Sequence, residues 1–227
     1  MRKIVLFAIL AAGMIHTAPA YDLLLSGKGG ASLAYLGYDF PDNLNVTGRD
    51  ISPYFYIGFG ADVNFNEYLG LRTGMTYEQK GSNLQGNFLV LVTLVNGDIT
   101  YSYRYLQFPL HAKVSIPLLI PGNVIITAGP ELGVNLEAER ETHFAGSSTI
   151  FKDDIDSLAE SVDFGISGSV GYDFPIGKIF GMILECGYYY GFIDLYKDDD
   201  SPADQRIELY NRTVKIGLTL YANVASF

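Results

Sequence analysis

The sequence predicts an all-β protein, a closed eight-stranded antiparallel transmembrane β-barrel with up-and-down connections. Apolar residues recur at every second position over long stretches, most clearly at Phe55, Ile57, Phe59, Ala61 and Val63. The positions between them carry glycines and polar side chains, and short and long hinges alternate along the chain. A soluble eight-stranded cup has a polar outside and an apolar lumen, so this pattern is its inverse.

The first three strands are expected at about 23–36, 53–65 and 68–80. The first is glycine-rich and weakly patterned, whereas the second and third alternate strictly. In the third strand the apolar positions Leu69 and Leu71 face one way, and Arg72 and Glu78 face the other way. Such alternation gives a strand one apolar face and one polar face.

The remaining five strands are expected at about 99–116, 123–137, 161–174, 178–195 and 208–221. Each repeats the same division, with apolar residues on one parity and glycine or polar residues on the other. The apolar parity of these strands begins with Leu106, Ile126, Val162, Phe180 and Val214, respectively. In a membrane barrel the apolar parity faces lipid and the polar parity faces the lumen.

The hinges fall into two classes. Short hinges are expected near 65–68, 117–122 and 174–178, and long polar hinges at 37–52, 81–98, 138–160 and 196–207. This alternation is typical of periplasmic turns and extracellular loops, and it places both termini on the periplasmic side. Residues 87–95 with Asn96-Gly97 resemble a type I′ hairpin. We interpret them as a hairpin extension above the membrane rather than a ninth crossing.

Residues 1–20 are predicted to be a secretory signal peptide, which leaves 21–227 as the barrel domain. Arg2 and Lys3 precede an apolar run, and Ala18-Pro19-Ala20 supplies a cleavage pattern. Without Arg2 and Lys3 the net charge is 13 − 25 = −12, which argues against nucleic-acid binding. Cys186 is the single cysteine, so no internal disulfide can form.

Several segments, in order, resemble a family of small eight-stranded outer-membrane β-barrels common in Bacteroidetes and typified by PorT-like proteins. They are residues 56–81 (YIGFGADVNFNEYLGLRTGMTYEQKG), 105–113 (YLQFPLHAK), 128–130 (AGP), 163–174 (DFGISGSVGYDF) and 211–213 (NRT). The resemblance implies an outer-membrane barrel, with some members tied to protein secretion. Such barrels usually end with an aromatic residue on the lipid-facing parity of the last strand. Phe227 departs from this, because it is odd-numbered whereas the apolar residues of the last strand are even-numbered, unless a bulge shifts the register.

The inward parity carries four basic residues and six acidic ones. Because an eight-stranded barrel is only wide enough for side chains to fill it, these charges are expected to pair and plug the lumen. A narrow proton or ion path is the alternative. The acidic side chains include Asp62, Asp163 and Asp173. The residues expected to form a structural lumen charge network are Lys28, Arg72, Glu78, His111, Lys113, Glu131, Glu185 and Lys215.

No catalytic, cofactor-binding or metal-binding residue is predicted, because His111 and His143 lack the oriented partners that such roles need.

The leading functional hypothesis is a structural or surface-interaction protein of the outer membrane that acts through its long loops, especially 81–98 and 138–160. A link to protein secretion or envelope maintenance comes with it. The alternatives are a lipid-modifying outer-membrane enzyme and a narrow channel for small solutes or ions. The expected partners are outer-membrane lipid, the barrel-assembly machinery and a protein at the extracellular loops, with no nucleic acid, no cofactor and a monomeric state.

Overall fold

The computed structural model describes residues 22–39, 46–90, 93–145, 150–195 and 208–226. These residues form ten β-strands and no helix long and apolar enough to cross a membrane. The strands are β1 (Asp22–Asp39), β2 (Val46–Asp50), β3 (Ser52–Asn64), β4 (Leu69–Val90), β5 (Thr93–Pro117), β6 (Asn123–Phe144), β7 (Ile150–Asp154), β8 (Val162–Ile176), β9 (Phe180–Gly191) and β10 (Glu208–Ser226).

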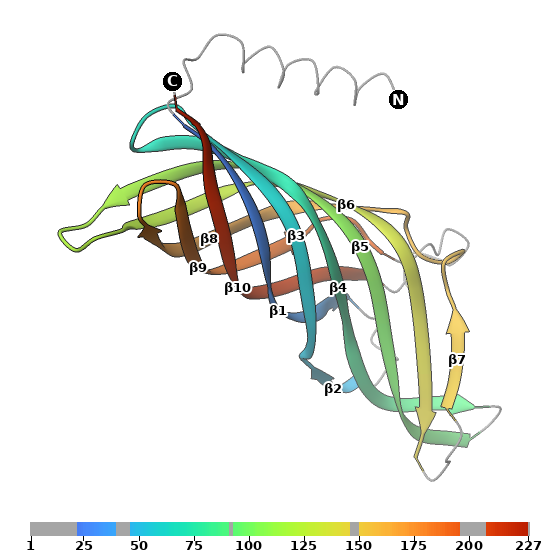
Figure 1. Ribbon diagram of the computed structural model, residues 1–227. Helices are drawn as coiled ribbons and strands as arrows, with labels where there is room; N and C mark the ends of the chain where they lie inside the picture. Colours follow the sequence, from blue (N-terminus) through green and yellow to red (C-terminus); the bar gives the residue numbers. More distant parts are fainter. Residues whose placement is uncertain (1–21, 40–45, 91–92, 146–149, 196–207, 227) are drawn as a thin grey trace.

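Eight of these ten described strands close into a ring. Going around it, β1 pairs with β3, followed by β4, β5, β6, β8, β9 and β10, and β10 pairs with β1 again. Every pairing is antiparallel, and β2 and β7 lie outside the ring (Figure 1). The predicted closed eight-stranded antiparallel barrel is therefore confirmed.

The two faces of the ring strands have opposite chemistry. On β8 the even-numbered Phe164, Ile166 and Val170 are exposed, whereas Asp163 and Ser167 are buried toward the lumen. An exposed apolar face is unfavourable in water, but it suits a bilayer, and alternation with a polar lumen is the pattern of outer-membrane barrels. The alternation in the sequence thus becomes an apolar outer band around a polar interior.

The short hinges lie where the sequence predicts them. They join Asn64 to Leu69, Pro117 to Asn123, and Ile176 to Phe180. Asp22 pairs with Ser226, so both ends of the described barrel lie at this same end of the ring. Figure 1 shows this end at the upper left, with the C-terminus beside the turns.

At the other end three strands run well beyond their neighbours. β4, β5 and β6 continue as paired strands, β2 adds to β4, and β7 adds to β6. We call this part the projecting sheet: β2, residues 79–90 of β4, 93–104 of β5, 137–144 of β6, and β7. It extends to the lower right in Figure 1. The predicted long loops 81–98 and 138–160 are therefore largely strands, whereas 196–207 lies outside the described residues.

The predicted hairpin turn at Asn96-Gly97 is wrong. Both residues lie inside β5, where Asn96 pairs with Asn87 and Gly97 with Gly86. The pairing continues to Val90 and Thr93, so the hairpin reverses between them. Asn-Gly is a local turn signal, and here the long register of β4 against β5 overrides it. The interpretation as a hairpin extension without a ninth ring strand agrees with the structure.

Two register shifts interrupt the ladders of the described strands β1, β5, β6 and β10. One lies near the end of β10, where Leu24 pairs with Asn223 but Leu23 pairs with Ala225. After residue 224 this bulge places the odd-numbered residues of β10 on the outer face. This is the shift that an odd-numbered terminal aromatic residue needs in order to face lipid, although Phe227 itself lies outside the described residues. No register shift occurs at Pro109 or Pro130. Pairing merely skips a few residues beside each proline, which lacks a backbone donor.

Candidate functional site

The lumen of the ring is crossed near its turn end by a chain of charged side chains. Arg72 on β4 donates from Nε and Nη2 to the two carboxylate oxygens of Asp62, at 2.8 and 2.9 Å. Lys113 donates to the same carboxylate at 2.7 Å, and Arg72 Nη1 reaches Glu185 on β9 at 3.1 Å. Because β4 and β9 have three strands between them on either side of the ring, the Arg72–Glu185 pair spans the lumen.

A second crossing group lies farther from the turn end and is centred on Lys215 of β10. Its ammonium lies 3.0 Å from Glu131, 2.8 Å from Glu78 and 3.0 Å from the amide oxygen of Gln107. Ser32 also donates to Glu78, at 2.8 Å. Since Gln107 is on β5, directly across the ring from β10, this group again bridges opposite walls.

His111 joins this second group through a serine. His111 Nε2 lies 2.7 Å from Ser167 Oγ, and Ser167 donates to Glu131 at 2.5 Å. A hydroxyl has one proton, and here it is donated to Glu131, so His111 Nε2 must be the donor to Ser167. A nucleophile–base pair needs the reverse direction, with the histidine accepting the serine proton. The arrangement ties three strands together and does not activate Ser167.

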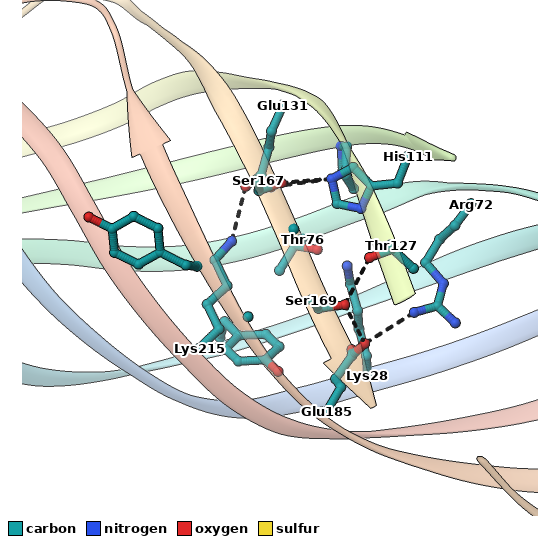
Figure 2. Close-up of a pocket in the computed structure, with 15 residues that line it drawn as sticks. Lys28, Arg72, Thr76, His111, Thr127, Glu131, Ser167, Ser169, Glu185 and Lys215 are labelled. Atoms are coloured by element: carbon teal, nitrogen blue, oxygen red, sulfur yellow. Dashed lines mark hydrogen bonds and ion pairs between the residues drawn. The ribbon is translucent and has the colours of Figure 1, made fainter. Parts of the chain in front are cut away.

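Lys28 is the member of the predicted set that stands apart. It has no hydrogen bond or ion pair to any residue in the described ranges, and no dashed line reaches it in Figure 2. It lines a cavity of about 60 Å³ together with Arg72, His111, Glu131 and Lys215. A void of this size holds a few water molecules, which are the simplest partners for its ammonium.

A third crossing group, nearer the outer end, was missed at the sequence level. Lys80 is fully buried, 3.6 Å from Asp163 on β8, and its ammonium lies 3.5 Å from the ring centre of Tyr189. Asn211 donates to Asp163 at 2.7 Å. Lys80 shares the even parity of Glu78, so following the alternation one step farther would have found it.

An apolar cluster closes the outer end of the lumen above these groups. Ile155 and Ala159 fold back from the segment after β7, and Leu195 follows β9. They pack against Tyr103 and Tyr105 and the remaining members Leu36, Ala138 and Leu209. The segment is anchored by Ile155 N–H to Ala138 O at 3.0 Å and by Glu160 N–H to Leu195 O at 2.9 Å. We call residues 155–160 the cap segment; no periodicity in the sequence pointed to it.

The cap segment gives a direct prediction. Replacing Ile155, which is 2% exposed, with aspartate should release the segment from the cluster. A buried carboxylate without a partner would raise the free energy of the closed arrangement by about 2 kcal/mol or more. Protease added to intact cells should then cut within 150–160 much faster. Ile150→Asp is the matched control, since Ile150 is 61% exposed. Equal cleavage of the two variants would mean that residues 155–160 do not close the lumen.

The projecting sheet carries ion pairs on the face that continues the lipid-facing wall. Leu136 is an extra residue in β6, since Arg104 pairs with Glu137 but Tyr105 pairs with Asn135. The bulge turns Glu137, Glu139 and Glu141 to the outer face. There Arg104 pairs with Glu137 and Glu139. Lys152 pairs with Glu139 and Glu141. Hydrogen bonds that Lys152 donates to Glu139 and Glu141 raise the pKa of Lys152 above its usual value. A charged outer face marks the place where the sheet leaves the bilayer.

No set of three or more His, Cys, Asp or Glu side chains in the described part of the chain is arranged to hold a metal. His143 lies exposed on β6 of the projecting sheet. At the turn end, a polar vestibule of about 410 Å³ opens below the Arg72 group, lined by residues that include Asp22, Lys113 and Asp173.

A family model described as the outer membrane protein beta-barrel domain matches residues 21–197. Among solved structures, the chain is similar to Neisserial surface protein A, with 10% identity over 88% of this chain and 96% of that chain and a TM-score of 0.43. It is similar to Ail, the attachment invasion locus protein of Yersinia pestis, with 13% identity over 88% and 99% and a TM-score of 0.40. It is also similar to OprG from Pseudomonas aeruginosa, with 12% identity over 90% and 97% and a TM-score of 0.45. No curated protein matches the chain.

Proposed function

The chain belongs to the outer membrane protein β-barrel domain family, and on that premise we propose that it is a sealed barrel that presents the projecting sheet as a contact surface outside the cell. The outer membrane is its location. The observation that carries the proposal is the pairing of β4, β5 and β6 with β2 and β7 beyond the apolar band, while the lumen beneath is filled.

The crossing groups support a lumen that does not conduct. Arg72, Lys215 and Lys80 each join strands across the interior, and the apolar cluster covers them on the outer side. An ion passing through would have to break these pairs in a low-dielectric interior. We therefore favour a structural role for the lumen charge network over an ion path.

The exposed edge of the projecting sheet supports a contact role. β7 pairs only with β6 among the described strands, and all five of its residues are exposed, including Phe151 at 51%. Exposed apolar side chains on an open strand edge are a common feature of protein contact sites. The partner we propose is a protein that packs on β7, and the barrel itself is proposed to be monomeric.

The resemblance to PorT-like barrels adds protein secretion and envelope maintenance to the processes that such a surface could serve, and this part stays a prediction. Surrounding outer-membrane lipid and the barrel-assembly machinery stay predicted partners in the same way. The lipid-modifying enzyme also stays an alternative. Mass spectra of outer-leaflet lipid from cells with and without the protein should be identical under our proposal.

Planar-bilayer recording tests the sealed lumen. We expect the purified, refolded protein to give no single-channel steps at any salt concentration, because three charged groups and the apolar cluster block the lumen. A family of discrete steps would contradict the proposal and restore the channel alternative.

Photo-cross-linking in growing cells tests the contact surface. A photoreactive residue introduced at Phe151 should give a discrete adduct with a protein, because this side chain lies on the exposed edge outside the apolar band. The same residue introduced at Phe174, which is 39% exposed within the band, should react only with lipid. Identical patterns from the two positions would contradict a protein contact at β7.

A further inference from the structure

The outer face of β8, β9 and β10 carries an arginine at the edge of the apolar band. Arg212 has the even parity of the lipid-facing residues of β10, since its neighbours Asn211 and Thr213 are buried toward the lumen. The outward apolar residues of β10 run from Val214 to Val224, eleven positions, and a membrane crossing takes about 9–11 residues. Arg212 therefore lies at headgroup level on the outer side.

Aromatic side chains surround this arginine. Its guanidinium carbon lies 3.5 Å from the ring centre of Tyr190 and 5.6 Å from that of Tyr210. The hydroxyls of Tyr35 and Tyr188 lie 2.9 Å apart beside it. A cluster of tyrosines with a basic residue is typical of a membrane interface, where the rings contact acyl chains and the polar ends contact headgroups.

Arg212 differs in its partners from the other three arginines whose side chains the structure describes. Arg72, Arg104 and Arg140 each pair with a carboxylate. Arg212 Nη1 donates to the carbonyl oxygens of Gly191 and Asn211, at 2.7 and 2.8 Å, and no acidic side chain in the described ranges pairs with it. A guanidinium has five N–H donors, and its planar fork fits a phosphate group. The positive charge is oriented by backbone but is not neutralised there.

A shallow apolar groove begins directly below this cluster. It has a volume of about 480 Å³, and its lining includes Ile126, Gly168, Val170, Cys186, Tyr188 and Val214. Gly168 pairs with Tyr188, which pairs with Val214, so the groove crosses β8, β9 and β10. Val214 is two residues from Arg212, about 7 Å along the strand. An acyl chain in the groove would thus end with its headgroup beside the guanidinium.

We propose that this face holds one phosphate-bearing lipid of the outer leaflet, with the phosphate on Arg212 and an acyl chain in the groove over Gly168. The positive charge selects the anionic headgroup, and the groove fixes the chain. The Tyr35–Tyr188 hydroxyl pair lies between them and can contact the glycosidic or ester oxygens that join headgroup to chain. This site goes beyond the proposed contact surface and does not depend on it.

The chain has no tryptophan, so a single introduced tryptophan reports one position on the barrel. Ile216→Trp places it beside the groove, because Ile216 pairs with Cys186 and is 48% exposed, and leaves the groove lining intact. Met75→Trp is the matched control on β4, across the ring from β9. Both variants would be reconstituted in dibrominated phosphatidylcholine, whose bromines quench tryptophan, and titrated with unbrominated phosphatidic acid.

The fluorescence of I216W should recover at about a fivefold lower fraction of phosphatidic acid than that of M75W, the effect of one basic group near a membrane surface. Adding Arg212→Gln should abolish the difference, whereas Arg104→Gln, at an arginine already paired with Glu137 and Glu139, should leave it unchanged. Inorganic phosphate should have no effect, since it lacks the acyl chain.

Equal titrations of I216W and M75W, or a difference that survives R212Q, would overturn the proposal. So would weak quenching of I216W by every brominated lipid, because that result means that a protein, rather than a lipid, covers the face.

Discussion

Replacing Arg72 with methionine should lower the free energy of unfolding by about 3–5 kcal/mol, the usual cost of removing one partner of a buried ion pair. Arg72 neutralises Asp62 and Glu185 at once, and methionine keeps much of its volume while removing its charge and all its donors. Lys113 would remain on Asp62, but Glu185 would keep only the hydroxyls of Thr219 and Ser169. Urea titration of the protein refolded in phospholipid vesicles measures the loss.

Arg104→Met is the control for that measurement. Arg104 also pairs with two carboxylates, Glu137 and Glu139, but on the projecting sheet, where its side chain is 32% exposed. Exposed pairs contribute about 0–1 kcal/mol. Similar losses for the two methionine variants would contradict our view that the lumen is a buried, charge-paired interior.

Gly30→Ala should prevent the ring from closing. A Cβ at Gly30 would lie 2.2 Å from the carbonyl oxygen of Ile216 and 2.5 Å from the Cα of Gly217, both backbone atoms of β10. Because β1 and β10 are the first and last strands of the ring, the two strands would have to separate at the seam that closes the barrel. We expect a cost of about 3 kcal/mol or more, at the upper end for overpacking. The folded, heat-modifiable species on gels should be lost.

Gly27→Ala provides the comparison within the same strand. A Cβ at Gly27 would meet no atom within 4 Å, so this alanine should leave the heat-modifiable band and the unfolding midpoint almost unchanged. If both glycine variants assemble equally well, close approach of β1 to β10 is not what requires glycine at position 30.

The period-two pattern predicted most of the barrel because it reports a local property of each strand. Alternation alone distinguishes the lipid-facing Phe164 and Ile166 from the buried Asp163 and Ser167. The short turns follow from it as well, since each lies between two alternating runs. This information is sufficient for the eight ring strands, their order and their faces.

Long-range pairing set the features that the sequence did not reveal. The turn expected at Asn96-Gly97 moved because β5 pairs there with both β4 and β6, and two ladders outweigh one local signal. The charged outer face of the projecting sheet depends on the extra residue at Leu136, which no local pattern marks. Ile155 and Leu195 lie outside every alternating run, so their place over the lumen could not be predicted from periodicity.

We propose that the barrel is closed to small molecules and carries the projecting sheet outside the cell. Cysteine labelling on intact cells with a membrane-impermeant maleimide tests it most directly. The background is Cys186→Ser, which removes the single native thiol, and the probes are Lys152→Cys on β7, Thr76→Cys in the lumen and Glu67→Cys in a short turn. We predict rapid labelling of K152C, labelling of E67C only after the outer membrane is permeabilised, and no labelling of T76C in the folded protein. Labelling of T76C or E67C on intact cells, or protection of K152C, would contradict the account.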